Sequence, residues 1–406
     1  MSVPAPRWLA ILGIGEDGVE GLSSAARALI SGAVLVVGGA RHMALAAPLI
    51  KGEQLRWPSP LTDAFPMILE RRGRTVVVLA SGDPYCFGVG TALRAVVPLE
   101  ETLCVPAPSA FSLACARLGW AMQDVATLSF CGRPLPAILP LLQPGARILA
   151  LSENGRTPGL LADLLRRNGF GPSLLHVLEA LGGLCERMRS ASANGGVWDD
   201  VGPLNLVGVE VAAEPGARVL PLARGLPEAL FEHDGQITKA EVRAVTLASL
   251  APRAGEFLWD VGCGSGSVAI EWSLCHPANR AIGIEARADR AARAGRNALA
   301  LGVPHLRLVT GEAPAALADL PPPDAVFVGG GATREGTLET CWSALRSGGR
   351  MVANAVTIET EACLFAAYET YGGTLLRLSI DRLDAIGSMH GFRPAMTVTQ
   401  WAVAKR

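Results

Sequence analysis

The sequence predicts two α/β domains, each built on a largely parallel sheet flanked by helices. Three observations predict this fold class. Short β-branched runs alternate with alanine- and leucine-rich stretches in both halves of the chain. A stretch rich in proline, glycine and alanine, residues 212–226, lies between the halves and is expected to be a linker. The 406 residues, 50% of them hydrophobic, exceed what one hydrophobic core usually holds.

The β-branched runs predict strands, and the alanine- and leucine-rich stretches predict helices. In the first half, strands are expected at residues 8–12, 33–37, 75–80, 147–151 and 204–211, and helices at residues 22–30, 89–96, 110–118 and 160–167. In the second half, strands are expected at residues 258–261, 281–284, 305–309, 325–328, 350–354, 374–380 and 396–403. The last two are expected to be joined by a glycine-containing loop, which gives a sheet of seven strands. The glycine patterns of the halves differ, which indicates two unrelated domains rather than a duplication.

A strand, a glycine loop and a helix follow one another in residues 255–272, GEFLWDVGCGSGSVAIEW. This segment carries an acidic residue and three glycines at two-residue intervals: Asp260, Gly262, Gly264 and Gly266. The dinucleotide pattern G-x-G-x-x-G fits poorly, because Ser267 stands at its third glycine. Glu285 follows Gly266 by 19 residues, near the spacing of about 20 at which a ribose-binding acid is expected. The pattern predicts a nucleoside-binding loop; the alternative is a loop that only allows tight packing of strand against helix.

A helix is expected to begin just before this loop, in the segment GQITKAEVRA that starts at Gly235. Thr238 would be its N-cap, and Glu241 three residues later would complete a capping box.

Several turns in the first half follow predicted strands. They are GIGEDG (residues 13–18), VVGGARHM (36–43), SGDPYCF (81–87) and PAPSAFSLACARLGW (106–120). Ligands of open α/β sheets bind beyond the carboxyl ends of strands, so these turns are candidate binding segments. Taken singly, each is also an ordinary turn or helix cap. Arg133 and Arg156, in FCGRP and SENGRTP, could bind substrate carboxylates or be solvated.

Charge and cysteine content exclude several classes of protein. With 36 basic and 37 acidic residues, the formal net charge of −1 disfavours a dedicated nucleic-acid binder. The nine cysteines form no C-x-x-C pair, so neither a disulfide framework nor a zinc site is indicated, and no metal is expected. No basic leader and no apolar run of about 18 residues is present. A cytoplasmic protein without a membrane segment is expected.

Taken together and in this order, the turns of the first half resemble those of the tetrapyrrole (class III) methyltransferases. The segments ITK-x-EVR, VGCGSGS, VTGEAPAAL, DAVFVGGG and GGRMVANAVT of the second half resemble the decarboxylating precorrin methyltransferases, which have the class I S-adenosylmethionine (SAM) methyltransferase fold. The two in one chain are similar to the precorrin-6Y C(5,15)-methyltransferase (decarboxylating) family. The resemblance implies a tetrapyrrole methylase domain at residues 1–215 and a seven-stranded Rossmann-like SAM methyltransferase domain at residues 230–406.

The resemblance also implies a reaction. The first domain would methylate carbon 5 of precorrin-6Y. The second would methylate carbon 15 and release CO₂ from the ring C acetate, giving precorrin-8X in cobalamin biosynthesis. SAM is the implied cofactor and a small tetrapyrrole the implied partner, with no nucleic acid and no membrane. An assembly of like subunits is expected.

By the same resemblance, SAM-binding residues can be assigned in both halves. In the first half they are Gly13, Gly15, Gly82, Asp83, Pro84, Ser109 and Ala110. In the second half they are Thr238, Gly262, Cys263, Gly264, Ser265, Gly266, Glu285, Glu312 and Ala313. Glu312 would lie near the adenine, although the family often has the shorter aspartate there.

Catalytic residues are not identified by the sequence. Arg334, Arg382 and Arg393 lie near predicted strand ends and are candidates for binding substrate carboxylates. His390 could return a proton to the macrocycle, or be a loop histidine without that role.

Two other classes of function stay open. The second half could be a relative of RNA-adenine methyltransferases, with the first half as an accessory domain. Such enzymes commonly have a polar-Pro-Pro-aromatic turn after the fourth strand, where this chain has Gly329, Gly330 and Gly331. Alternatively, the chain could be a non-catalytic binding module that keeps a SAM-binding fold.

Overall fold

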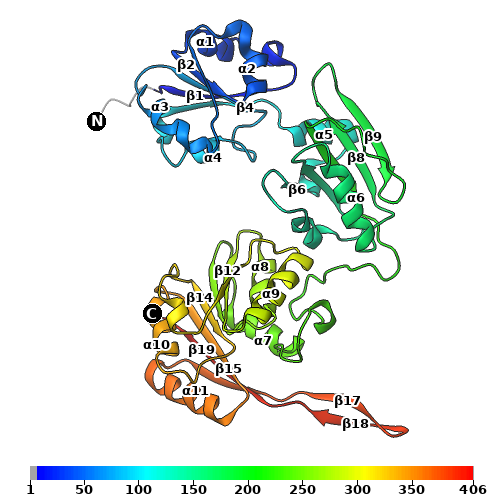
Figure 1. The fold of residues 1–406 in the computed structure, drawn as a ribbon, viewed down its shortest axis with the longest axis vertical. Helices are drawn as coiled ribbons and strands as arrows, with labels where there is room; N and C mark the ends of the chain where they lie inside the picture. The colour runs from blue at the N-terminus through cyan, green and yellow to red at the C-terminus, as the bar shows by residue number, and fades with distance from the viewer. Residues whose placement is uncertain (1–6, 406) are drawn as a thin grey trace. The chain divides into compact units, whose positions relative to one another are not determined.

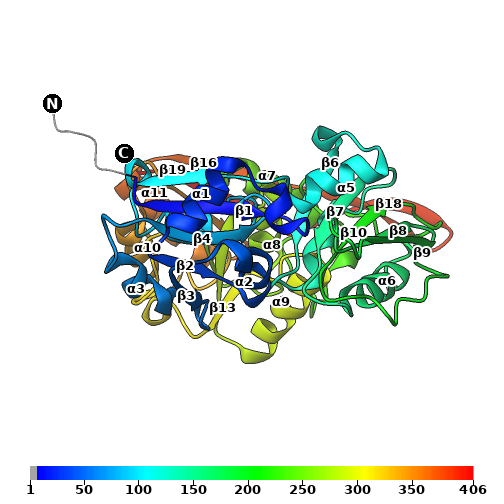
Figure 2. The same cartoon turned by 90° about the horizontal axis from the view of Figure 1, so that it is seen from above.

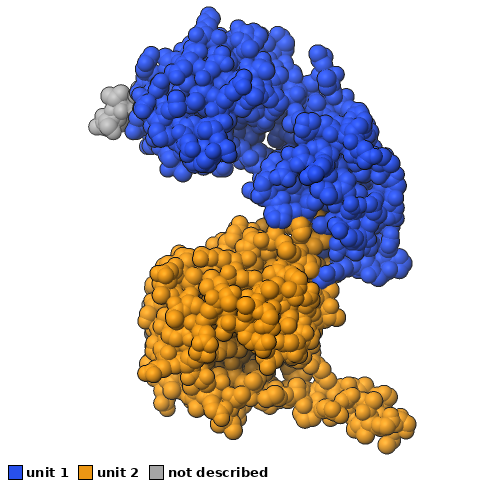
Figure 3. All heavy atoms as spheres, in the orientation of Figure 1, with its two compact units in different colours: residues 1–135, 143–218 blue, residues 136–142, 219–406 orange. Residues whose placement is uncertain are grey.

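A computed structural model describes residues 7–405, which form two compact units (Figure 3). Unit 1 comprises residues 1–135 and 143–218, and unit 2 comprises residues 136–142 and 219–406. The last passage of the chain from unit 1 to unit 2, between residues 218 and 219, lies within the proline-, glycine- and alanine-rich stretch. Leu220 and Leu226, at the end of that stretch, are buried in the core of unit 2 with Phe231. The end of the stretch is therefore packed rather than free.

Unit 1 contains two five-stranded sheets. The first consists of β1 (Leu9–Ile14), β2 (Leu35–Gly38), β3 (Glu53–Arg56), β4 (Val76–Ser81) and β5 (Thr102–Val105). Its helices are α1 (Ser24–Gly32), α2 (Ala40–Ala46), α3 (Phe65–Leu69) and α4 (Gly90–Leu93). The strand order is β3-β2-β4-β1-β5, and all the pairings are parallel. The carboxyl ends of all five strands therefore lie at one edge.

Alternate residues of these strands face opposite layers of helices, as the period of a strand requires. Leu12 and Val36 pack in a cluster with residues of α1 and α2, whereas Ile11 and Leu35 pack with residues of α3 and α4. The helices flank the sheet in both views (Figure 1 and Figure 2). Because both faces are covered, β1, β2 and β4 are nearly continuously apolar, and the sequence predicted these three strands. Strand β3, EQLR, is polar and largely exposed, and neither β3 nor β5 was predicted.

The second sheet of unit 1 is mixed. It consists of β6 (Val125–Ser129), β7 (Arg147–Leu151), β8 (Leu174–Glu179), β9 (Arg187–Ser192) and β10 (Asn205–Glu210), with α5 (Ala110–Leu118) and α6 (Thr157–Arg167). In the order β6-β7-β10-β8-β9 only β6 and β7 are parallel, so the expectation of a parallel sheet throughout the first half is wrong here. The connection between β8 and β9 is too short for a parallel crossover and joins them as a hairpin. Strand β9, RMRSAS, is polar and gave no apolar signal.

Unit 2 has the predicted seven-stranded sheet. Its strands are β11 (Phe257–Val261), β12 (Arg280–Glu285), β13 (Arg307–Thr310), β14 (Ala325–Val328), β15 (Arg350–Ala355), β16 (Thr374–Leu378) and β19 (Val398–Ala404). Its helices are α7 (Ala240–Leu250), α8 (Ser267–Cys275), α9 (Ala288–Ala300), α10 (Thr337–Ala344) and α11 (Ile358–Tyr371). The strand order is β13-β12-β11-β14-β15-β19-β16, and β19 is antiparallel to both of its neighbours. One face packs against α10 and α11, and the other against α7 and α8.

The predicted loop between the last two strands of the sheet is in fact a hairpin. Its strands are β17 (Asp381–Ile386) and β18 (Met389–Pro394), which pair only with each other among the described strands. In Figure 1 the hairpin extends out from the rest of unit 2. Leu383 and Phe392 face each other across it and are 63% and 75% exposed. Without a buried face the hairpin has no clean alternation of apolar and polar residues, so the sequence suggested a loop.

Helix α7 begins one residue later than predicted, and the expected capping box is wrong. Its N-cap is Lys239, whose side chain accepts no capping hydrogen bond. Instead, the carboxylate of Glu228 accepts a bond of 3.2 Å from the amide of Ala240. Glu241 forms an ion pair with Arg382. An acceptor from outside the helix therefore takes the place of the Thr238 hydroxyl.

A fully buried ion pair holds the segment with which the chain enters unit 2. Arg243 pairs with Glu271, and both side chains have no exposed surface. Glu271 also accepts bonds of 2.7 and 2.9 Å from the amides of Gly225 and Leu226, and Arg243 donates to the carbonyl of Thr238. Because each charge is paired and hydrogen-bonded, the pair can hold these segments against α8 without an uncompensated buried charge.

Among residues 7–405, none of the helices is long and apolar enough to cross a lipid bilayer.

Candidate functional site

The glycine loop of unit 2 lies at the carboxyl end of β11. Gly262, Gly264 and Gly266 have φ angles of +72°, +56° and +77°, which residues with a side chain rarely adopt. A Cβ on Gly262 would lie 2.7 Å from the backbone nitrogen of Gly330. The loop is thus in close backbone contact with the glycine turn that follows β14, and larger residues at either place would separate the two strand ends.

Glu285, at the end of β12, lies directly beside this loop. Its side chain accepts a hydrogen bond of 2.9 Å from the amide of Gly264 and another of 3.0 Å from the amide of Arg287. The residue is only 6% exposed. Each carboxylate oxygen retains capacity for a further donor. The acid that spacing alone selected is therefore fixed where it could accept bonds from ligand hydroxyl groups.

Asp260 lies in β11, two residues before Gly262, and is 1% exposed. Its Oδ2 accepts a bond of 2.9 Å from the amide of Ala269, whereas its buried Oδ1 has no hydrogen-bond partner among the described residues. Burial raises the pKa of Asp260 to about 7 against the opposing effect of the Ala269 bond, and nearby Glu285 raises it further. A buried carboxyl oxygen without a partner suits a site that a cationic or donor ligand completes.

Three other residues assigned to SAM lie at or near this loop: Thr238, Ser265 and Cys263. The segment containing Thr238 lies over the loop, since a Cβ on Gly264 would be 3.8 Å from the carbonyl oxygen of Gln236. Ser265 is buried, and its hydroxyl also has no partner within residues 7–405. Cys263 is buried with its sulfur against Gly283, so only its backbone faces the loop.

Glu312 and Arg334 pair with each other. Two bonds of 2.6 and 2.7 Å join the guanidinium to the carboxylate, and both side chains are about half exposed. Glu312 follows β13 and Arg334 follows β14, and Ala313 next to Glu312 is buried. A ligand carboxylate at Arg334 would therefore have to compete with Glu312.

Three further candidates belong to the β17–β18 hairpin. His390 and Arg393 are on β18, where Arg393 pairs across the hairpin with Asp384 at 3.0 Å. Arg382, on β17, pairs with Glu228 and Glu241 near the start of α7. The structure thus places His390 and Arg393 on an extended arm, separate from the glycine loop that the other predicted residues surround.

In unit 1, the predicted residues meet where β1, β4 and β5 end. A Cβ on Gly13 would lie 1.9 Å from the carbonyl oxygen of Gly82, and one on Gly82 would lie 3.0 Å from the Cα of Ser109. Gly82 has a φ of +54°. Three turns that are far apart in the sequence are therefore in backbone contact, and glycine is needed at two of them.

The side chains of this site are mostly engaged in local structure. Asp83 accepts a bond of 2.8 Å from the amide of Tyr85, and Ser109 caps α5, which begins at Ala110, through a bond of 3.1 Å from the amide of Ser112. Gly15 lies against the carboxylate of Asp17. Pro84 is buried. These interactions shape the backbone, so a ligand would meet main-chain groups here.

Phe87 ends the Gly-Asp-Pro segment in an unusual conformation. It is not a glycine, yet its φ is +54°. Phe87 is 45% exposed. Its ring packs edge-on to Phe111, and the ring centroid lies 5.2 Å from the guanidinium carbon of Arg133. Strained residues of this kind gather at ligand sites. Arg133 therefore contacts the ring of Phe87, which borders the site.

Sequence reasoning missed several polar groups of unit 1. Ser152 and Asn205, at the paired ends of β7 and β10, are buried, and Ser152 Oγ and Asn205 Oδ1 have no partner among the described residues. Arg41, His42 and Ser81 form a cluster at the edge of the first sheet. Arg41, His42, Ser81 and Ser152 lie in turns that the sequence had already marked, so their position at strand ends could have selected them. Asn205, at the start of β10, gave no such signal.

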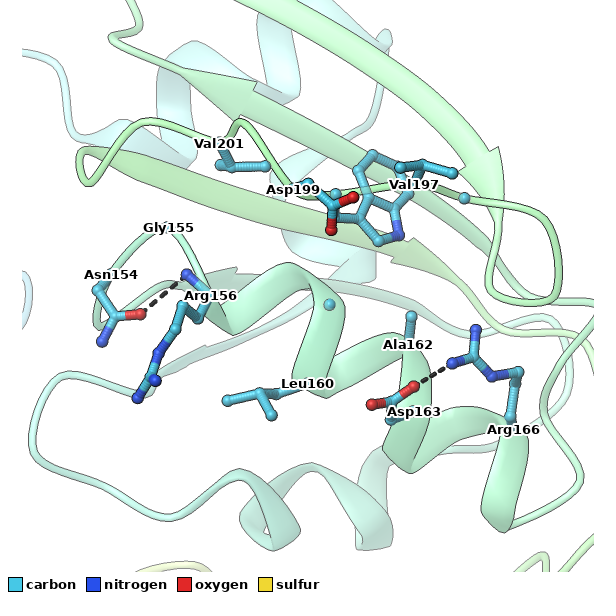
Figure 4. Close-up of a pocket in the computed structure, with 13 residues that line it drawn as sticks. Asn154, Gly155, Arg156, Leu160, Ala162, Asp163, Arg166, Val197, Asp199 and Val201 are labelled. Atoms are coloured by element: carbon cyan, nitrogen blue, oxygen red, sulfur yellow. Dashed lines mark hydrogen bonds and ion pairs between the residues drawn. The ribbon is translucent and has the colours of Figure 1, made fainter.

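A cavity of about 680 Å³ lies between α6 and residues 196–201. Arg156 lines it at the start of α6, where the side chain of Asn154 accepts a bond from the Arg156 amide (Figure 4). None of the residues assigned to SAM line this cavity. It is therefore distinct from the glycine-lined strand ends.

Within residues 7–405, no group of three or more His, Cys, Asp or Glu side chains is placed to hold a metal ion.

Comparisons with known proteins match both units. Residues 9–193 match the family model for tetrapyrrole (corrin/porphyrin) methylases, and residues 229–405 match that for the precorrin methyltransferase domain. A Sinorhizobium protein named precorrin-6Y C(5,15)-methyltransferase [decarboxylating] is 55% identical over 98% of this chain and 96% of its own length. A Mycobacterium tuberculosis protein of the same name is 40% identical over 98% and 99%. The solved C-terminal domain of the Rhodobacter capsulatus precorrin-6Y C5,15-methyltransferase is 48% identical over 46% of this chain and all of that one, with a TM-score of 0.44.

Proposed function

Because the chain belongs to the precorrin-6Y C(5,15)-methyltransferase (decarboxylating) family, we propose that it methylates carbons 5 and 15 of precorrin-6Y and removes the ring C acetate carboxyl as CO₂. The product would be precorrin-8X. The observation that carries the proposal is that each unit has its own glycine-lined edge of parallel strands, within a region matched by a methyltransferase family model. Two methyl transfers therefore have two separate places in one chain.

The unit 1 site is assigned to carbon 5, and the unit 2 site to carbon 15 and the decarboxylation. This allocation follows the resemblance of residues 235–357 to decarboxylating precorrin methyltransferases. Domain limits at residues 215 and 230, a cytoplasmic location and an assembly of like subunits stay predictions.

The residues of both sites fit SAM as cofactor. In unit 2, the three glycines leave room for close backbone approach, Glu285 can accept from ribose hydroxyls, and the partnerless oxygen of Asp260 can face a cationic amino group. In unit 1, the contact of Gly13, Gly82 and Ser109 gives a backbone cradle. When bound, SAM supplies an electrophilic methyl group on a sulfonium.

The chain's own contribution to methyl transfer is placement. Methylation of an electron-rich ring carbon with a neutral thioether leaving group needs no nucleophilic side chain, so holding the reactants in line supplies most of the acceleration. The Gly329–Gly331 turn offers no bulky side chain at the glycine loop, and this leaves space for a macrocycle.

For the decarboxylation, the protein must hold the acetate away from strong cationic partners. As the carbon–carbon bond to CO₂ breaks, its electron pair passes into the conjugated macrocycle, which serves as the electron sink. The pairing of Arg334 with Glu312 suits this requirement, because it keeps that guanidinium from stabilising the carboxylate in its ground state.

Incubation of the full chain with precorrin-6Y and SAM, followed by mass analysis of the tetrapyrrole, tests the proposal. Gain of two methyl groups with loss of one CO₂ is expected. An unchanged tetrapyrrole would contradict it, and salt-sensitive retention and methylation of RNA would favour the RNA-methyltransferase alternative instead.

The titration of Asp260 gives a pH-dependent prediction. A cationic ligand favours the ionised carboxylate, so SAM binding at the unit 2 site should expel a proton and tighten by up to about tenfold per pH unit as the pH rises toward 7. Calorimetry in buffers of different ionisation enthalpy, on a full chain carrying Asp83→Arg, would measure this release. Asp260→Asn should abolish it. SAM binding to the Gly264→Arg chain, which reports the unit 1 site, is the control for titration of SAM itself.

Without ligand, ionisation of the same carboxyl lowers the free energy of unfolding, whereas with SAM it strengthens binding. Its pKa is raised from 3.8 to about 7 on folding, so the folded chain holds a proton that the unfolded chain has released. Its contribution to the free energy of unfolding should therefore fall as the pH rises from about 4 to 7. A contribution that instead rises over this range would contradict a protonated Asp260.

A further inference from the structure

The two carboxylates proposed to bind SAM in unit 2 are shut off from solvent. Glu285 is 6% exposed and Asp260 is 1% exposed. Both retain capacity to accept further hydrogen bonds. A dissolved ligand cannot reach these oxygens unless part of the protein moves. An element that covers the glycine loop is therefore expected to move when a ligand enters.

Residues 233–236, which we call the strap, lie over the glycine loop. The carbonyl oxygen of Gln236 is the nearest atom to a Cβ built on Gly264, at 3.8 Å. Gly264 in turn donates its amide to Glu285 at 2.9 Å. All four strap residues are exposed and belong to no helix or strand. The strap thus has solvent on one side and the binding loop on the other, so its movement would open the loop.

The strap runs between two anchored ends. Before it, the amide of Glu232 donates to the side chain of Asn297 at 2.8 Å, and Asn297 donates back to the carbonyl of Glu232 at 2.9 Å. Asn297 is buried and also donates to the carbonyl of Ser265 in the glycine loop. After the strap, Ile237 packs against a buried apolar cluster. Between these ends Gly235, with a φ of +93° and open space at its Cβ position, leaves the strap free to turn.

Asp234 links the strap to helix α9. Its Oδ2 pairs with Arg290 at 2.8 Å and with Arg293 at 3.1 Å, and the three side chains are at most 26% exposed. Its Oδ1 accepts a bond of 3.2 Å from the amide of Gln236. That bond and the two guanidinium groups hold the pKa of Asp234 below its ordinary value, so the pairs are charged near pH 7. Within residues 7–405, these pairs are the only polar link from the strap to the rest of the unit.

On the basis of the proposed function, we propose that the strap is a gate over the SAM site of unit 2, held shut by the ion pairs of Asp234 with Arg290 and Arg293. When these pairs separate, the strap turns at Gly235 and SAM reaches Glu285 beneath it. The pairs stabilise the closed strap equally with and without SAM. They therefore control how fast SAM enters and leaves, and they leave its equilibrium affinity unchanged.

Surface plasmon resonance, with SAM flowing over the immobilised full chain, tests the gate. Asp83→Arg is present in every chain so that only the unit 2 site is measured. Asp234→Asn removes the charge and keeps the oxygen that accepts from the Gln236 amide. It should raise the association and dissociation rate constants together, each about tenfold, the effect of one lost hydrogen bond between charged groups. The Kd should stay within about twofold of that of the parent chain.

Glu232→Gln is the matched control. Glu232 precedes the strap and also pairs with α9, through Arg296, but both of these side chains are more than half exposed. An exposed pair contributes little, so this change should leave both rate constants nearly unaltered. A chain carrying Arg290→Gln and Arg293→Gln should behave like Asp234→Asn, and adding Asp234→Asn to it should produce no further change.

The gate is overturned if the two rate constants of Asp234→Asn do not rise together, for example if affinity falls through faster dissociation alone. If the parent chain binds no SAM, the cofactor assignment of the proposed function fails instead. Hydrogen exchange at the Gly264 amide, which bonds to Glu285 beneath the strap, then still decides this inference. Faster exchange in Asp234→Asn than in the parent chain supports the gate, and equal exchange overturns it.

Discussion

Gly264→Arg is expected to abolish methylation of carbon 15 and release of CO₂, leaving a tetrapyrrole with one added methyl group. Gly264 has a φ of +56°, which a residue with a side chain adopts only under strain. The nearest atom to a Cβ there is the carbonyl oxygen of Gln236 at 3.8 Å, so the arginine would extend into the space between the loop and the Thr238 segment. That space is assigned to SAM, and mass analysis of the product would reveal its loss.

Gly255→Arg provides a matched control for strain. Gly255 precedes β11, has a φ of +81° and has open space around its Cβ position. Arginine there should impose a similar backbone cost and leave both methylations intact. Persistent CO₂ release from the Gly264→Arg chain would show that the decarboxylation does not belong to the unit 2 site.

The reciprocal variant Asp83→Arg should prevent methylation of carbon 5 while sparing carbon 15 and the decarboxylation. Asp83 holds the Gly82–Pro84 turn through its bond to the Tyr85 amide, and an arginine cannot accept that bond. If CO₂ release vanished here and survived in Gly264→Arg, the roles assigned to the two units would be reversed.

Glu285→Ala is expected to weaken SAM binding at the unit 2 site by about 1.5–3 kcal/mol, or about 10- to 150-fold. The change removes the acceptor for ribose hydroxyls and the bonds that Glu285 accepts from the amides of Gly264 and Arg287. Calorimetry on the full chain carrying Asp83→Arg would measure the unit 2 site alone.

Asp289→Ala is the control for Glu285, since Asp289 is a nearby exposed acid paired with Arg287. It should leave the SAM affinity unchanged. An affinity equal to wild type in Glu285→Ala would remove Glu285 from the cofactor site.

Much of this architecture could be predicted from local signals. The central strands of the two α/β sheets, such as β1, β4, β11 and β14, are buried, so their apolar runs stand out. The spacing between the glycine loop and Glu285 identified a loop and an acid that the fold brings together. Strand β9 of the mixed sheet in unit 1 and the β17–β18 hairpin were missed because polar or exposed strands lack an apolar period. The start of α7 was misplaced because Glu228, ten residues upstream of Thr238, supplies the acceptor for its first amide.

The polar groups of the sites were less predictable than the glycines. Backbone geometry requires glycine at these strand ends, and the sequence shows the glycines directly. The partnerless oxygen of Asp260 depends on which neighbours surround that side chain in space. Arg334 and Glu312 were assigned separately, yet they neutralise each other.

Methyl-labelled SAM offers the most direct test of the claim that one chain holds two methyltransferase sites. Wild-type protein would convert precorrin-6Y with SAM carrying a ¹³C methyl group, and NMR of the product would locate the label while released CO₂ is measured. We expect two labelled methyl groups, at carbons 5 and 15, with one CO₂ for each tetrapyrrole. A single labelled position at full conversion, or two labels without CO₂ release, would contradict it.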